Sequence, residues 1–92
     1  MPRIEKQLVV VNKKGLHARP AAVFVQLAEK FPVSVTICKG DEQVNGKSIM
    51  GLLMLGAQCG TVLDLIVEGD DAAAAMAEFE VFFNKQEEEI IS

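Results

Sequence analysis

The sequence predicts an α+β fold, an open-faced sandwich in which a four-stranded, mostly antiparallel sheet carries three helices on one face. Three observations predict it. The apolar residues change along the chain from strand-like alternation to helix-like intervals of three and four. The elements marked in this way follow the order β-α-β-β-α-β-α, which suits a split β-α-β arrangement. The chain has 92 residues, of which 50% are hydrophobic, so we expect a single domain over residues 1–92.

The N-terminal third predicts a strand followed by a helix. Residues 8–11 are apolar and mostly β-branched, which indicates the end of a first strand, and residues 12–15 form a turn. A helix is expected over roughly 20–30, because Pro20 suits a first turn and Pro32 pushes the residue before it out of helical geometry. The apolar face of that helix would consist of Phe24, Leu27, Ala28 and Phe31.

The middle of the chain predicts a hairpin and a short helix. Apolar and polar residues alternate over residues 33–38, and a turn and a short returning strand at 43–45 follow. Ser48 then precedes an apolar run over 49–55, which predicts a second helix ended by Gly56. The run is too rich in apolar residues to be buried on one face only, so part of it should be exposed.

The C-terminal third predicts a strand and a longer helix. Residues 63–68 alternate as a fourth strand, and residues 69–71 form a turn with acidic residues at a helix start. The last helix is expected over roughly 72–86. Its apolar face would consist of Ala72, Ala75, Met76, Phe79, Phe82 and Phe83.

Charge and composition exclude several function classes. The net charge is −4 and the chain has no Trp or Tyr, which argues against a nucleic-acid-binding module. One His and two Cys cannot complete a zinc site, and Cys38 and Cys59 are expected to be buried or half-buried free thiols. No apolar stretch approaches the ~20 residues of a membrane span, and no signal peptide opens the chain, so we expect a cytoplasmic protein with no membrane partner. No metal or cofactor is expected.

The single histidine, His17, lies just before the start of the first predicted helix. The first N–H groups of a helix are positively polarised, and Arg19 adds a fork of donors that matches phosphate geometry. Residues 1–20 carry five cations and one acidic residue, so this end can present a positive patch. Histidine is a nucleophile that can hold a phosphoryl group. The pattern is consistent with a phosphohistidine site, but a lone histidine near a helix start is common, and spacing alone favours a plain loop or capping histidine.

Two segments decide in favour of the phosphohistidine. The run from Gly15 to Ala22, GLHARPAA, resembles the active-site signature of the HPr family, the histidine-containing phosphocarriers of the bacterial phosphoenolpyruvate-dependent phosphotransferase system. The run from Val44 to Leu55, VNGKSIMGLLML, resembles the regulatory-serine segment of the same family. The resemblance covers essentially the whole chain, and its two motifs lie in register.

The resemblance implies a phosphoryl relay rather than an autonomous enzyme. His17 would accept phosphate from enzyme I, itself charged by phosphoenolpyruvate, and pass it to an EIIA-type acceptor. The family uses the Nδ1 nitrogen, and Arg19 matches its phosphate-stabilising arginine. The positions that match the family's apolar docking surface are Leu16, Ile49, Met50 and Leu53.

Ser48 matches the serine that an ATP-dependent HPr kinase phosphorylates in part of the family. It would cap the second helix in any case, so regulation and capping alone both remain open. The alternative to a phosphocarrier is a regulatory binding module controlled only through Ser48. His17 discriminates, because such a module has no need of a phosphate-accepting nucleophile.

Some positions depart from the sugar-pathway members of the family. Many of those members carry a basic residue where Val23 or Glu29 stands, so the positive rim around the site is thinner here. The stretches 52–55 and 82–84 are closer to the nitrogen-branch paralogue, NPr. Whether the acceptor is a sugar-permease EIIA or a nitrogen-type EIIA is therefore left open.

Overall fold

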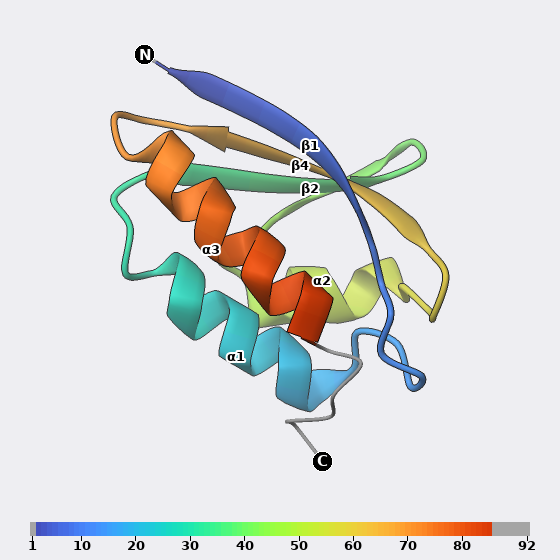
Figure 1. Ribbon diagram of the computed structural model, residues 1–92. Coiled ribbons are helices and arrows are strands. Elements are labelled where there is room, and N and C mark those ends of the chain that lie inside the picture. Colours follow the sequence, from blue (N-terminus) through green and yellow to red (C-terminus); the bar gives the residue numbers. More distant parts are fainter. Residues whose placement is uncertain (1, 86–92) are drawn as a thin grey trace.

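In the computed structural model, which describes residues 2–85, four strands form one sheet and three helices cover one of its faces (Figure 1). The sheet has the strand order β1-β4-β2-β3, and all neighbouring strands in it are antiparallel. The predicted fold class and element order are confirmed. The elements are β1 (Arg3–Val9), α1 (Ala18–Ala28), β2 (Ser34–Lys39), β3 (Glu42–Asn45), α2 (Ile49–Leu55), β4 (Val62–Glu68) and α3 (Ala72–Lys85).

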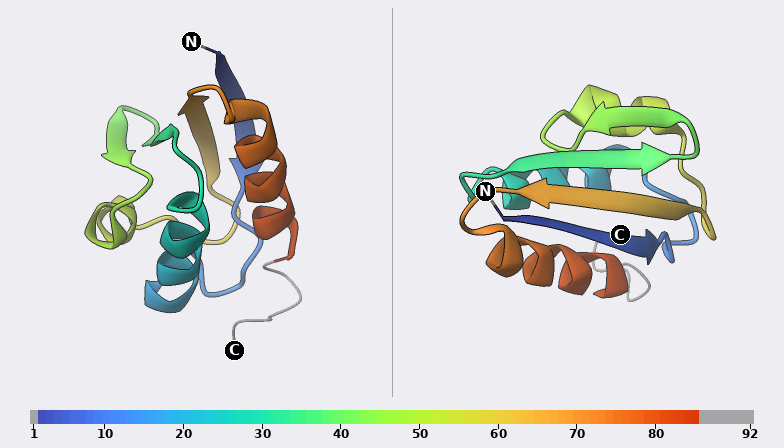
Figure 2. Two further views of the ribbon diagram at one scale, coloured as in Figure 1. Left: turned by 90° about the vertical axis from the view of Figure 1, so that its left-hand side faces the viewer. Right: turned by 90° about the horizontal axis from the view of Figure 1, so that it is seen from above.

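The helical layer is arranged along the two edges of the sheet. Viewed from above, α3 runs along the β1 edge and α2 lies near β3 at the opposite edge (Figure 2). α1 lies between them and contacts both other helices. The start of α1 and the end of α2 therefore belong to the same layer, although about 35 residues of chain separate them.

The core fills the space between the sheet and the helices. The predicted inner face of β4 is Leu63, Leu65 and Val67, and each of these side chains is 0% exposed. All six predicted apolar positions of α3 are buried as well. Phe24 of α1 joins the helices, because its ring centroid lies 4.9 Å from Phe79 and other α3 rings surround it. Aromatic rings in tilted and edge-to-face contact pack more favourably than their buried area alone accounts for.

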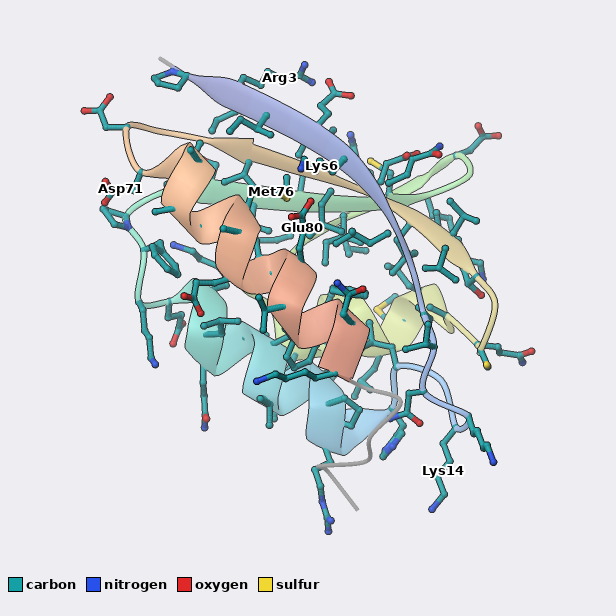
Figure 3. The ribbon with its side chains drawn as sticks, viewed as in Figure 1. Arg3, Lys6, Lys14, Asp71, Met76 and Glu80 are labelled. Atoms are coloured by element: carbon teal, nitrogen blue, oxygen red, sulfur yellow. The ribbon has the colours of Figure 1, made fainter. Side chains whose placement is uncertain are left out.

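β1 and α1 differ from the prediction by two residues at an end, whereas β2, β3 and β4 differ by one. β1 ends at Val9, two residues before the predicted end. Its Lys6 lies on the helical side of the sheet opposite Leu65 and forms an ion pair of 2.7 Å with Glu80 of α3 (Figure 3). That charged residue hid the alternation of the strand. α1 begins at Ala18 and ends at Ala28, so Pro20 lies at the third helical position. The predicted end of the last helix, residue 86, lies outside the described residues.

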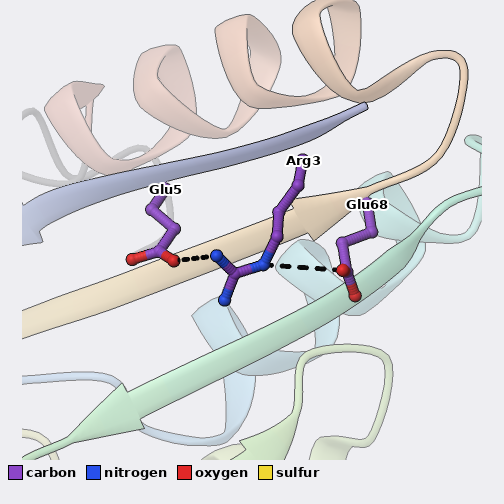
Figure 4. Close-up of polar contacts among 3 residues, drawn as sticks. All are labelled: Arg3, Glu5 and Glu68. Atoms are coloured by element: carbon purple, nitrogen blue, oxygen red, sulfur yellow. Dashed lines mark ion pairs between the residues drawn. The ribbon is translucent and has the colours of Figure 1, made fainter. Parts of the chain in front are cut away.

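The open face of the sheet carries polar groups rather than a second layer. Arg3 forms ion pairs with Glu5 on its own strand and with Glu68 across the strand pair, the latter at 3.5 Å (Figure 4).

Both cysteines are free thiols. Cys38 is half-buried, as expected, but Cys59 is exposed, contrary to expectation. Cys59 is exposed because it lies in the loop before β4 rather than in a strand.

Candidate functional site

His17 occupies the N-cap position of α1. Its backbone is extended (φ −90°, ψ −169°), and its carbonyl accepts the Ala21 N–H at 3.0 Å. The imidazole makes no capping hydrogen bond, and the side chain is half-buried. The backbone of His17 thus starts the helix, while its ring is not used for that purpose.

Gly15 lets the His17 loop approach the segment that follows α2. Its φ is +76°, a region that favours glycine, and a Cβ at this position would lie 2.6 Å from the Ala57 carbonyl oxygen. The next residue, Leu16, donates its N–H to that same oxygen at 2.8 Å. A residue with a side chain at position 15 would therefore displace the loop that carries His17.

The electrostatics around His17 favour an anion. Pro20 has no N–H and the Ala21 N–H donates to His17, so the N–H groups at the very start of α1 are those of Ala18 and Arg19. The first turn of α1 contains no acidic residue, and the Arg19 side chain is exposed there. On the preceding loop, the exposed Lys14 points away from the body of the protein (Figure 3). The charges and N–H groups around His17 are therefore those of a site that suits an anion.

The second helix presents an apolar stripe to solvent. The stripe consists of Ile49, Met50, Leu53 and Met54, whose exposed fractions are 42%, 66%, 37% and 73%. The opposite side of α2 is anchored in the core by Leu52 and Leu55, at 0% and 2%. A run of exposed apolar side chains on one helix is typical of a protein-binding surface. Met54 is not among the docking residues predicted from the sequence, although its spacing of four residues from Met50 places it on the same face of a helix.

Leu16 differs from the other predicted docking residues. It is only 6% exposed and belongs to the hydrophobic core. The Leu16–Ala57 hydrogen bond draws this part of the loop inward, so a partner could reach only a small part of the side chain.

Ser48 is the N-cap of α2. Its Oγ accepts the Gly51 N–H at 3.0 Å, and its carbonyl accepts the Leu52 N–H at 3.0 Å. The predicted capping role is therefore present, and the hydroxyl stands next to the first residue of the apolar stripe.

A model of the family described as "PTS HPr component phosphorylation site" matches residues 4–85. The chain belongs to the HPr family. These proteins are phosphocarriers of the phosphotransferase system, and the matched region contains His17, Arg19 and the whole of α2. The family resemblance seen in the two sequence motifs is thus confirmed.

Individual relatives cover nearly the whole chain. The phosphocarrier protein HPr of Treponema pallidum is 45% identical over 87 residues, which span 94% of this chain and 99% of the relative. The phosphocarrier protein NPr of Shewanella violacea is 40% identical over 76 residues, or 83% and 84% of the two chains. The crystal structure of HPr-C-His from Thermoanaerobacter tengcongensis superposes with a TM-score of 0.89 at 42% identity, covering 94% of this chain and 97% of that one. HPr and NPr are therefore both among the relatives.

The described part of the chain lacks two other kinds of site. Within residues 2–85, no cluster of three or more His, Cys, Asp or Glu side chains could hold a metal ion. Over the same part of the chain, none of the helices has the length and apolar content needed to cross a membrane.

Proposed function

We propose that His17 is the residue that carries the phosphoryl group, accepting it from enzyme I and passing it to an EIIA-type protein. A ring nitrogen would use its lone pair to form the N–P bond while the bond from phosphorus to the donor breaks. The reverse exchange then delivers the group to the acceptor. The observation that carries the proposal is that His17 starts α1 with a ring that does not cap it, two residues before Arg19.

The donor and acceptor would dock on the apolar stripe of α2. Ile49, Met50 and Leu53 are the exposed members predicted from the sequence, and Met54 extends the same face. Methionine is flexible and polarisable, which suits a surface that must fit more than one partner. These exchanges would take place in the cytoplasm, where phosphoenolpyruvate is available.

Incubation with phosphoenolpyruvate and enzyme I tests the proposal. The protein should gain one phosphoryl group that is labile in acid and stable in base, and His17→Ala should gain none. Equal labelling of His17→Ala would contradict the assignment. Because the chain contains a single histidine, no second imidazole can substitute for it.

The acceptor is identified by offering the phosphorylated protein to sugar-permease and nitrogen-type EIIA proteins in parallel. The stretches that resemble NPr favour the nitrogen type, whereas the HPr relatives favour the sugar type. The EIIA type that is phosphorylated with the higher kcat/KM shows whether the protein serves the sugar branch or the nitrogen branch.

Regulation through Ser48 is a second proposal, supported by its place at the N-cap of α2 beside Ile49. An HPr kinase would add about −1.5 to −2 charges there, which the helix start favours by about 0.3–1 kcal/mol but a docking partner must desolvate. Ser48→Asp should therefore accept phosphate from enzyme I more slowly than Ser48→Ala, without a lower melting temperature. Equal transfer rates would leave Ser48 as a cap, worth about 0.5–2 kcal/mol.

A further inference from the structure

Two lysines outside α2 hold the two ends of the helix in place. Lys39, the last residue of β2, donates its Nζ to the Leu55 carbonyl at 2.9 Å, and Leu55 is the last residue of α2. Lys47, just before the helix, donates its Nζ to the Phe31 carbonyl beyond the end of α1, also at 2.9 Å. Both lysines are half-buried.

These contacts bring a positive charge to the C-terminal ends of α1 and α2, where the helices themselves have none. Neither α1 nor α2 has a basic residue in its last turn. The carbonyls at a helix C-terminus have no intrahelical donor and carry the negative end of the helix dipole. An ammonium group brought from β2 satisfies one such carbonyl of α2, and a charge-assisted hydrogen bond is stronger than a neutral one.

A short segment of chain links the carbonyl bound by Lys39 to the loop that carries His17. Leu55, whose carbonyl it binds, is followed by Gly56 in the left-handed region at φ +60° and then by Ala57. The Ala57 carbonyl accepts the Leu16 N–H at 2.8 Å, and Leu16 precedes His17. Leu55, Ala57 and Leu16 are all buried, at 2%, 4% and 6% exposed, so this path is tightly packed.

We propose that Lys39 is a positioning residue for phosphoryl transfer, because its bond to the Leu55 carbonyl fixes the segment to which the His17 loop is hydrogen-bonded. This inference rests on the proposed function of His17. Within residues 2–85, the Lys39 Nζ is hydrogen-bonded to the Leu55 carbonyl and not to His17 or to the apolar stripe, so its effect would be on the rate of transfer rather than on docking.

The test compares Lys39→Met, which keeps the aliphatic stem but removes the donor, with Lys39→Arg, which keeps a charged donor. Lys30→Met is the matched control, since it removes the same charge from an exposed position at the end of α1. The first measurement is amide hydrogen exchange at Leu16, relative to Leu65 in the central strand β4, which reports global unfolding. The second is the steady-state rate of phosphorylation by enzyme I.

In Lys39→Met, exchange at Leu16 should rise about tenfold while exchange at Leu65 changes less than about twofold. The kcat of phosphorylation should fall about fivefold to tenfold with KM for enzyme I within about twofold, because misplacement of a reacting group lowers the rate more than the affinity. Lys39→Arg should recover most of both losses, and Lys30→Met should match the parent.

Unchanged exchange at Leu16, or an equal rise at Leu16 and Leu65, would overturn the positioning role. A loss of affinity with kcat intact would overturn it as well. A parent protein that takes no phosphate from enzyme I would overturn the proposed function instead, and the exchange measurement would still decide whether Lys39 fixes the loop.

Discussion

At the scale of single residues, the site depends on one close approach between backbones. Gly15 passes the Ala57 carbonyl so closely that a Cβ would lie 2.6 Å from its oxygen, and Leu16 then hydrogen-bonds the same oxygen. The position of His17 is thereby fixed from outside its own helix. A side chain at position 15 would therefore displace the loop that carries His17.

Gly15→Ala should slow phosphorylation of His17 and lower stability. The left-handed backbone alone costs a non-glycine residue about 1–2 kcal/mol, and displacement of the loop adds to that cost. Gly40→Ala is the matched control, because Gly40 has φ +59° with nothing within 4 Å of an added Cβ. Urea denaturation and transfer rates should show a smaller loss of stability and no loss of rate in Gly40→Ala. Equal rates in the two variants would contradict this account.

Arg19→Ala should still be phosphorylated by enzyme I, but about tenfold to a hundredfold more slowly. The reason is the loss of charge-assisted hydrogen bonds worth about 1.5–3 kcal/mol. Arg3→Ala removes the same charge on the open face of the sheet, where Arg3 pairs with Glu5 and Glu68. Single-turnover labelling compares the two variants, and a comparable slowing in Arg3→Ala would point to net charge rather than to Arg19.

At the scale of elements, α2 could be predicted closely and the His17 loop could not. Ser48 and Gly56 bracket the helix as local capping signals, and the structure gives Ile49–Leu55. Leu16, by contrast, is predicted as a docking residue from the family resemblance, and its burial could not be foreseen because it depends on Ala57, about 40 residues later in the chain. The anchoring of α2 by Lys39 is equally invisible in the sequence, since no local pattern links a strand end to a helix end.

Met50→Asp should weaken docking of enzyme I while leaving the fold intact. Met50 is 66% exposed on the apolar stripe, so a carboxylate costs little in the free protein but must lose water when a partner binds. Val81→Asp introduces the same charge on α3, at a residue that is 47% exposed. The KM for enzyme I should rise in Met50→Asp and stay unchanged in Val81→Asp. A melting temperature many degrees lower with unchanged transfer would show instead that Met50 supports the core.

At the scale of the whole molecule, the layers could be predicted but the strand order could not. Alternation in residues 63–68 identified the inner face of β4, because a half-buried strand has period two. Its placement between β1 and β2 depends on pairings between distant segments, which leave no local trace. The first residues of β1 show no clear apolar alternation, because Lys6 lies on the inner side of the strand, where it forms an ion pair with Glu80 of α3.

Phe24→Ala should destabilise the entire fold rather than the site alone. Phe24 is 1% exposed and contacts three rings of α3, so truncation leaves a cavity between the two long helices and should cost about 3–5 kcal/mol. Val81→Ala, on the exposed side of α3, should change the free energy of unfolding by less than about 0.5 kcal/mol. Denaturant unfolding monitored by circular dichroism measures both, and a loss below 1 kcal/mol in Phe24→Ala would contradict this packing role.

The short length of α2 limits how many proteins can bind to it at the same time. Seven residues make a helix about 10 Å long, whereas a standard protein interface buries about 800 Å² on each side. On the docking surface proposed above, the donor and the acceptor would share α2, and two proteins cannot bind so short a helix at once, so the donor would have to leave before the acceptor binds. The overall rate of phosphoryl transfer would then be limited by how quickly each complex dissociates. Tight binding to either partner would therefore slow the transfer. An excess of unphosphorylated acceptor should compete with enzyme I and slow the relay it depends on.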